Sequence, residues 1–206
     1  MINAMEKIKS LTIERLFPYL LILGGVVGLF ASFMITYDKF KLLENPSYQP
    51  VCSLNPVISC GSVMNSKQGA VFGFPNPFIG LAAFAVLLTV GVSILAGAKF
   101  KRWFWLGLEL GSIGGLVFVH WLFYQSVFRI QALCIFCMMV WAVVIPIFLY
   151  STIMNLRQSH LRPKSWLKKL TDFIERHHLD ILIVWYLAIF VAIIQHFWYY
   201  WKLQLP

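Results

Sequence analysis

Five long apolar stretches, separated by shorter polar segments, dominate the chain. They cover approximately residues 16–36, 78–98, 103–128, 133–154 and 182–201. Each is close to the roughly 20 residues that an α-helix needs to cross the hydrocarbon core of a bilayer. The pattern therefore predicts an all-α membrane protein with five transmembrane helices.

The first stretch follows Lys7, Lys9 and Arg15, an arrangement that a signal peptide also has. Its apolar run is longer than the about 7–15 residues of a signal core, and no small-residue cleavage site follows it. We therefore expect a retained anchor helix.

The composition agrees with a membrane protein. Charged residues make up 12% of the 206 residues and hydrophobic residues 60%, whereas soluble domains contain about 25% charged residues. The net charge of +9 comes from basic residues that gather between the apolar stretches. Such clusters are typical of topology signals beside anionic lipid, so we expect the bilayer, and not nucleic acid, as their partner.

The Lys and Arg residues are divided unequally between the two sides of the predicted membrane. Segments 1–15, 99–102 and 157–176 contain twelve of the 17, and the segments on the other side contain five. Because cytoplasmic loops are enriched in Lys and Arg, we expect a cytoplasmic N-terminus and an extracytoplasmic C-terminus. Residues 156–178 are then a basic cytoplasmic linker, and residues 179–206 contain the fifth transmembrane helix.

All four cysteines fall on the expected extracytoplasmic side. Cys52 and Cys60 lie in the polar loop 37–77, and Cys134 and Cys137 begin the fourth span. Disulfides form and persist in oxidising compartments, so two dithiol pairs on this side suit redox chemistry.

The spacing of the second pair carries more detail. Residues three apart share one helix face, within reach of a disulfide. The unpaired amides of a first helical turn favour the Cys134 thiolate, and Cys137, one turn deeper, could meet the ring of a quinone. A structural disulfide and a zinc site built from all four cysteines are the alternatives. The eight-residue spacing of Cys52 and Cys60 and the oxidising side favour redox chemistry and no metal.

Three segments together form a specific pattern. They are V-C-S-L-N-P-V-I-S-C-G-S-V-M-N-S at 51–66, F-P-N-P-F-I-G at 74–80, and C-I-F-C at 134–137. In this order they resemble the vitamin K epoxide reductase family. The resemblance covers about residues 15–155 and implies a four-helix transmembrane bundle, to which the fifth helix is an addition. We therefore expect residues 1–155 to form that bundle, with the cysteine loop 37–77 outside.

The resemblance also implies roles for the cysteines. Cys134 and Cys137 match the pair beside the quinone, with Cys137 as the thiol that reacts with it. Cys52 and Cys60 match the shuttle pair on the loop, and we expect Cys52 to be attacked first by an incoming thiolate.

Three further positions correspond to quinone-binding residues of the family. Ser66 matches a serine close to the quinone, and Asn76 matches an asparagine that hydrogen-bonds the quinone oxygen. At Trp141 the animal members carry a tyrosine; an indole N–H still donates one hydrogen bond but accepts none. This departure bears on epoxide reduction more than on quinone reduction.

These features predict a membrane thiol–disulfide oxidoreductase in a bacterial plasma membrane. It would oxidise a separate extracytoplasmic thioredoxin-like protein, because the chain ends at Pro206 without such a domain, and reduce ubiquinone or menaquinone. It would thereby support disulfide bond formation. The alternatives are a vitamin K epoxide or quinone reductase proper, and a non-enzymatic membrane protein with structural disulfides.

Other residues within the spans allow two interpretations each. Small residues recur at four-residue spacing in two spans, and we expect them to let helices pack closely. The alternative is that they leave room for an isoprenoid tail. They are Gly24, Gly28 and Ser32 in the first span and Gly107, Gly111 and Gly115 in the third. His120 could donate a proton to a reduced quinone or hydrogen-bond another helix. Glu109 could act at depth or reach the interface.

Overall fold

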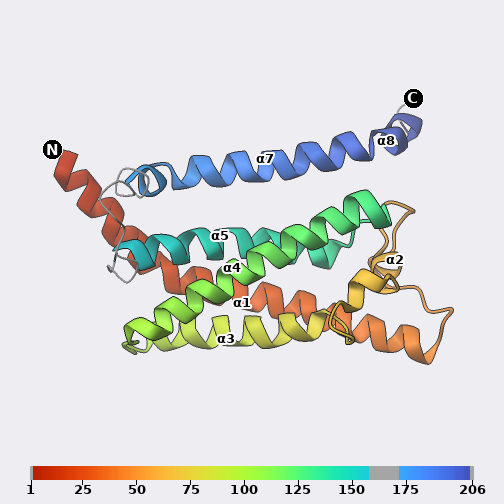
Figure 1. The fold of residues 1–206 in the computed structure, drawn as a ribbon, viewed down its shortest axis with the longest axis horizontal. Coiled ribbons are helices and arrows are strands. Elements are labelled where there is room, and N and C mark those ends of the chain that lie inside the picture. The colour runs from red at the N-terminus through yellow and green to blue at the C-terminus, as the bar shows by residue number, and fades with distance from the viewer. Residues whose placement is uncertain (1, 158–171, 205–206) are drawn as a thin grey trace.

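The computed structural model describes residues 2–157 and 172–204, and these residues are mainly helical (Figure 1). The long helices are α1 (Ile2–Glu44), α3 (Pro77–Leu95), α4 (Arg102–Tyr124), α5 (Ile135–Arg157) and α7 (His178–His196). Shorter elements are α2 (Cys60–Met64), η1 (Lys67–Ala70), η2 (Gln125–Ile130) and α8 (Trp198–Gln204). Among the described residues, five helical segments are long and apolar enough to cross a membrane. The all-α membrane fold class predicted from the sequence is confirmed.

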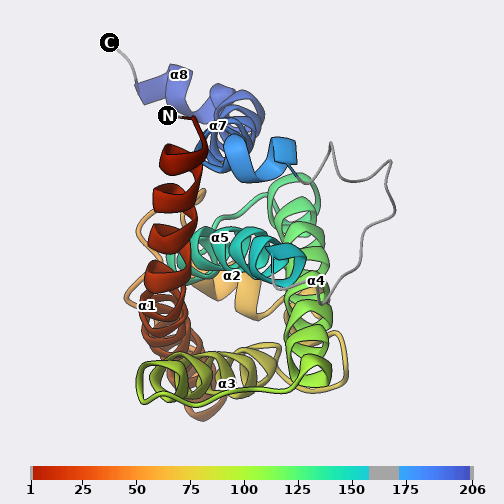
Figure 2. The same ribbon diagram turned by 90° about the vertical axis from the view of Figure 1, so that its left-hand side faces the viewer.

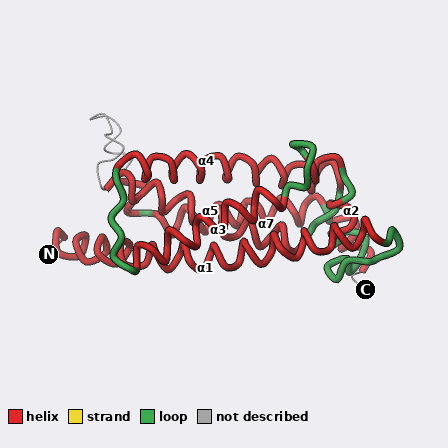
Figure 3. The backbone as a smooth tube through the Cα atoms, turned by 90° about the horizontal axis from the view of Figure 1, so that it is seen from below, coloured by secondary structure: helices red, strands yellow, loops and turns green. Residues whose placement is uncertain are grey.

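Helix α5 lies at the centre of the bundle (Figure 2). Helix α1 packs against α3 and α5, α4 packs against α5, and α7 lies on the outside. The long helices run side by side, with the loops gathered at the two ends (Figure 3). The close packing expected for the first span is present, since a Cβ added at Gly24 would lie 2.7 Å from the Ile147 side chain.

The first helix is longer than the sequence predicts. It continues through residues 37–44, which we assigned to the loop, and ends at Glu44. Leu42 packs against the buried cysteine cluster, and Lys41 pairs with Glu44 at 3.0 Å, so these residues gain contacts by staying helical. Pro46 stops the helix, because a proline disfavours helical backbone in the residue before it.

The fifth span is also shifted, to His178–His196, and a break at Phe197 separates it from α8. The middle of the expected cytoplasmic linker, residues 158–171, lies outside the described residues. The division of the chain into bundle, linker and fifth helix stays a prediction.

Hydrogen bonds attach α7 to the bundle at defined points. Pro146 has no N–H, so the Ala142 carbonyl in α5 lacks its usual helical donor. The Tyr186 hydroxyl of α7 donates to that carbonyl at 2.6 Å. The Trp185 indole N–H donates to His120 Nε2 at 2.9 Å. In lipid no water can replace these partners, so the fifth helix is fixed against α4 and α5.

Candidate active site

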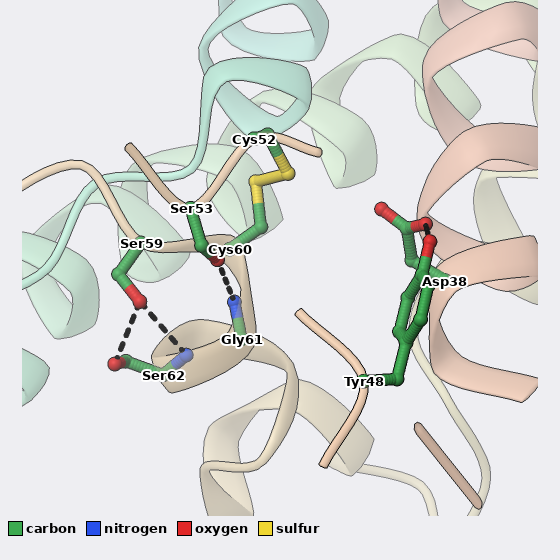
Figure 4. The surroundings of a disulfide bond; sticks show 8 residues. All are labelled: Asp38, Tyr48, Cys52, Ser53, Ser59, Cys60, Gly61 and Ser62. Atoms are coloured by element: carbon green, nitrogen blue, oxygen red, sulfur yellow. Dashed lines mark hydrogen bonds between the residues drawn. A yellow bond between two sulfur atoms is a disulfide. The ribbon is translucent and has the colours of Figure 1, made fainter. Parts of the chain in front are cut away.

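A tight turn brings Cys52 and Cys60 together. The Asn55 side-chain oxygen accepts hydrogen bonds from the N–H groups of Val57 (3.0 Å) and Ile58 (2.7 Å), as Asn often does in turns. The turn leaves the two cysteine Cα atoms 5.6 Å apart, and the side chains form a disulfide (Figure 4). The expected loop pair is therefore joined in this structure.

A short backbone ladder places this disulfide beside the second pair. The Ser59 N–H donates to the Leu133 carbonyl at 2.9 Å, and the Leu133 N–H donates to the Val57 carbonyl at 2.7 Å. As a result the sulfur atoms of Cys52, Cys60 and Cys134 all lie within 4.8 Å of one another. Zinc ligation requires thiolates, which a disulfide does not offer, whereas thiol–disulfide exchange requires this kind of approach.

The cysteine cluster is shielded from solvent. Cys60 and Cys134 are 0% exposed and Cys52 is 4% exposed. We expected Cys52 to be reachable in a polar loop. The structure buries it under its neighbours, while Val51 and Leu54 on either side are 74% and 67% exposed.

Cys134 directly precedes Ile135, the first residue of α5, and so lies at the N-cap position and not within the first turn as expected. Its carbonyl accepts the first helical hydrogen bond from Met138 at 3.0 Å. A hydrogen bond from the Cys137 thiol lowers the pKa of the Cys134 thiol below its usual value, against the effect of burial. The backbone N–H groups of Phe136 and Cys137 act in the same direction. A thiol with a lowered pKa is a better leaving group in disulfide exchange.

Cys137 packs against the cysteine cluster and also lines a cavity of about 890 Å³. The cavity lies between α3 and α4 and is lined mainly by apolar side chains. Ser66, Asn76 and Trp141, the three positions predicted for quinone binding, line the same cavity as Cys137. Residues distant in the sequence are therefore brought to one cavity.

The polar groups of Ser66 and Asn76 are engaged with the loop. The Ser66 hydroxyl donates to the Val63 carbonyl at 2.7 Å. The Asn76 amide donates to the Gln68 carbonyl at 2.7 Å, and its oxygen accepts from the Val71 N–H at 3.0 Å. The Asn76 amide has a second N–H, and Asn76 lines the cavity. Asn76 therefore stabilises the turn at the edge of the cavity.

The glycine stripe of α4 differs from the expected close packing. Gly107, Gly111 and Gly115 line the cavity. A Cβ added at Gly107 or Gly111 would meet nothing within 4 Å. These glycines keep the space open, so the alternative interpretation, room for a long ligand, fits them better.

His120 and Glu109 lie outside this cavity. His120 Nδ1 bonds the Leu116 carbonyl at 2.9 Å and Nε2 accepts from Trp185, so His120 connects α4 to α7. Glu109 accepts a 2.7 Å hydrogen bond from Thr152 and connects α4 to α5. Both residues have structural partners that account for their presence in the bundle.

Comparison with known proteins agrees with this geometry. The model of the vitamin K epoxide reductase family matches residues 19–152. The mouse (Mus musculus) vitamin K epoxide reductase complex subunit 1 is 26% identical over 138 residues, which covers 61% of this chain and 83% of that protein. The chain belongs to the vitamin K epoxide reductase family. The matched segment contains all four cysteines and ends before α7. Members of this family are oxidoreductases, which supports an enzyme here.

One polar residue near the cysteines was missed by sequence analysis. Asp38 on α1 is 0% exposed, and its carboxylate accepts a 2.9 Å hydrogen bond from the Tyr48 hydroxyl (Figure 4). The available signal was an acidic residue directly after an apolar span. The interpretation of residues 37–44 as an exposed loop concealed it.

Substitution of Asn76 by Ala is expected to act on both the loop and the cavity. It removes two hydrogen bonds that hold residues 68–76 in place, each worth about 0.5–1.5 kcal/mol. We expect a lower melting temperature and a rise of about tenfold in the KM for quinone. The control is Asn65→Ala, because Asn65 is exposed and absent from the cavity lining. An unchanged quinone KM in Asn76→Ala would remove this residue from the site.

Proposed function

We propose that this protein is a quinone-dependent thiol–disulfide oxidoreductase. It takes electrons from an extracytoplasmic thioredoxin-like protein, delivers them to a membrane quinone and so supports disulfide formation. One observation carries the proposal: sulfur atoms run from the loop disulfide, through buried Cys134, to Cys137 at the cavity. Membership of the vitamin K epoxide reductase family, which suggests a redox role for this chain, supports the proposal.

The proposed reaction proceeds by thiol–disulfide exchange. A partner thiolate attacks Cys52 and breaks its bond to Cys60, and the second partner thiol then releases Cys52 and leaves the partner oxidised. Cys60 attacks Cys134 in a Cys134–Cys137 disulfide, and Cys137 leaves as the thiol. Attack of Cys52 on Cys60 restores the loop disulfide and releases Cys134. The structure has the oxidation states that follow this transfer, a loop disulfide with Cys134 and Cys137 as thiols.

The cavity suits a quinone. Its apolar lining fits an isoprenoid chain, and the second Asn76 N–H is a hydrogen-bond donor for a carbonyl oxygen. A bound quinone supplies a two-electron, two-proton acceptor. Cys137 then closes a disulfide with Cys134, and each thiol gives up its proton.

Access of the partner requires movement of the loop. Because Cys52 is buried, a thiolate can reach its sulfur only when the turn around Asn55 opens. The exposed apolar side chains of Val51 and Leu54 are the first groups that such a partner would meet. The partner in this proposal is a separate protein, and the bundle within residues 1–155 contains the whole redox path.

Quinone reduction by the purified protein tests the proposal. Wild-type protein with a reduced thioredoxin-like donor is expected to reduce ubiquinone or menaquinone and not vitamin K epoxide. Turnover with the epoxide instead would make it an epoxide reductase. If the loop disulfide has a reduction potential below about −300 mV and the protein shows no turnover, the cysteines are structural.

The orientation is part of the same proposal. Helix α2, which begins at Cys60, lies at the end of the bundle opposite the N-terminus (Figure 1), and the other cysteines lie close to Cys60. We place that end outside the cytoplasm of a bacterial plasma membrane. After reduction of intact cells, a membrane-impermeant maleimide is expected to label Cys52 and Cys60. Labelling that occurs only after permeabilisation would reverse the orientation.

The glycine stripe gives a test of where the quinone tail lies. In Gly111→Leu the new side chain projects into the cavity, and overpacking typically costs about 1–3 kcal/mol. We expect the KM of a long-tailed quinone to rise about tenfold and that of a short-tailed analogue to stay unchanged. Gly114→Leu is the matched control, because Gly114 is on the same helix and does not line the cavity. Equal effects on both quinones would place the tail elsewhere.

A further inference from the structure

Asp38 lies on the face of α1 that contacts the cysteine cluster. Ile35, three residues before it, belongs to the same buried apolar cluster as Cys52, Cys60 and Cys134, and Leu42, four residues after it, packs against that cluster. Residues at this spacing share one helix face, so Asp38 faces the cluster between them. Its side chain is 0% exposed.

The Asp38 carboxylate has one satisfied and one unsatisfied oxygen. Oδ1 accepts from the Tyr48 hydroxyl at 2.9 Å, and Oδ2 has no hydrogen-bond partner among the described residues. In Figure 4 the carboxylate lies between Tyr48 and the disulfide. Its charge acts on Cys134 and disfavours the Cys134 thiolate. A buried carboxylate oxygen without a partner is costly, and such groups usually require an explanation.

We propose that Asp38 is the proton-transfer group for exchange between the two cysteine pairs. This inference rests on the proposed function. In the intermediate that joins Cys60 to Cys134, Asp38 Oδ2 takes the proton of the Cys52 thiol. The Cys52 sulfur then bonds to Cys60, and the bond from Cys60 to Cys134 breaks. Asp38 returns the proton to the departing Cys134 sulfur, so the step balances without another reagent.

The neighbourhood fits this role. Among the described residues, the titratable groups seen to interact with Asp38 include the Tyr48 hydroxyl from the loop and the Cys134 thiol before α5. Tyr48 holds the carboxylate through Oδ1, which leaves Oδ2 for the sulfur atoms. Lys39, the next residue, is directed elsewhere and donates to the Met64 carbonyl and the Asn65 side chain. Because bulk water is excluded from the buried cluster, a proton acceptor inside the protein replaces it.

The test is Asp38→Asn, which keeps the size of the side chain and an oxygen for Tyr48. With a thioredoxin-like donor at pH 7 we expect turnover to fall about 10²-fold, the usual contribution of a general acid–base group. The loss should shrink as the pH approaches about 8.5, where a free thiol ionises without help. Non-reducing peptide mapping of quenched reactions should show the Cys60–Cys134 intermediate accumulating. With dithiothreitol, which reduces the inner pair directly, turnover should stay near that of the wild type.

Two controls separate proton transfer from support of the fold. Glu44→Gln makes the same chemical change at the exposed end of α1 and should have no effect. Tyr48→Phe keeps the carboxylate but removes the hydrogen bond that positions it, so turnover should fall clearly less than in Asp38→Asn. A loss as large as that of Asp38→Asn would mean that the pair only holds the loop, and would overturn the proposal.

The remaining outcomes are also distinct. Wild-type protein that reduces no quinone with either reductant would refute the proposed function. Active wild type with a fully active Asp38→Asn across the pH range would refute the role of Asp38 alone. If Asp38→Asn does not fold, the wild-type protein supplies the test. The rate at which its Cys60–Cys134 intermediate is resolved should vary little between about pH 6 and 8. A tenfold rise per pH unit, as for an unassisted thiol, would overturn the proposal.

Discussion

Cys137→Ala is expected to abolish quinone reduction with every thiol donor. Cys137 is the cysteine that lines the cavity, whereas Cys134 is fully buried against the loop disulfide. Without the Cys137 sulfur, no disulfide can close beside the quinone, and Cys134 has no partner at its position. Turnover with both the protein donor and dithiothreitol should fall to the uncatalysed background. The measurement is quinone absorbance during reduction by purified protein.

The control for this variant is Met138→Ala. Met138 is the next residue on α5 and packs in the core, but it does not line the cavity. It should keep its turnover. Cys137→Ser is a second check, because a hydroxyl fills nearly the same space and forms no disulfide. Near-normal turnover of either Cys137 variant would show that the electrons leave by another route.

The cysteine arrangement was the part of the site that the sequence could predict best. The three-residue spacing of Cys134 and Cys137 at the start of an apolar stretch fixes a common helix face. This spacing does not predict which loop residues contact the two cysteines. The ladder between Ser59 and Leu133 decides it, and backbone pairing between short irregular segments leaves no periodic pattern to detect.

Residues with two compatible roles could not be resolved from the sequence. The glycines of α1 and α4 have the same four-residue spacing, yet Gly24 packs against α5 and Gly111 lines a cavity. The difference depends on whether a neighbouring helix approaches, which is a property of the assembled bundle. Asn76 similarly holds the loop and borders the cavity at once.

Helix ends were the other weak point. Hydropathy places a boundary where the apolar run stops, but α1 continues to Glu44 because its polar turns contact the loop above. That shift moves Asp38 from a supposed loop onto a buried helix face. The attachment of α7 could not be predicted either, since the Ala142 carbonyl freed by Pro146 has its partner, Tyr186, 44 residues later in the chain.

Cys52→Ala is expected to separate the two halves of the electron path. With a thioredoxin-like donor its turnover should fall to background, because the loop disulfide that accepts the partner's electrons cannot form. With dithiothreitol most of the turnover should remain, since Cys134 and Cys137 are intact and Cys137 is reachable through the cavity. The measurement is the ratio of the two quinone-reduction rates.

The remaining loop cysteine sharpens this prediction. In Cys52→Ala, Cys60 still lies within 4.8 Å of Cys134 but has lost the thiol that would release it. A Cys60–Cys134 disulfide should therefore accumulate under oxidising conditions and appear in non-reducing peptide maps. Ser53→Ala is the control, because Ser53 lies beside Cys52 and its hydroxyl only accepts from the Gly61 N–H at 3.2 Å. If Cys52→Ala keeps full turnover with the protein donor, electrons enter at Cys60 or deeper, and the loop disulfide is not the entry point.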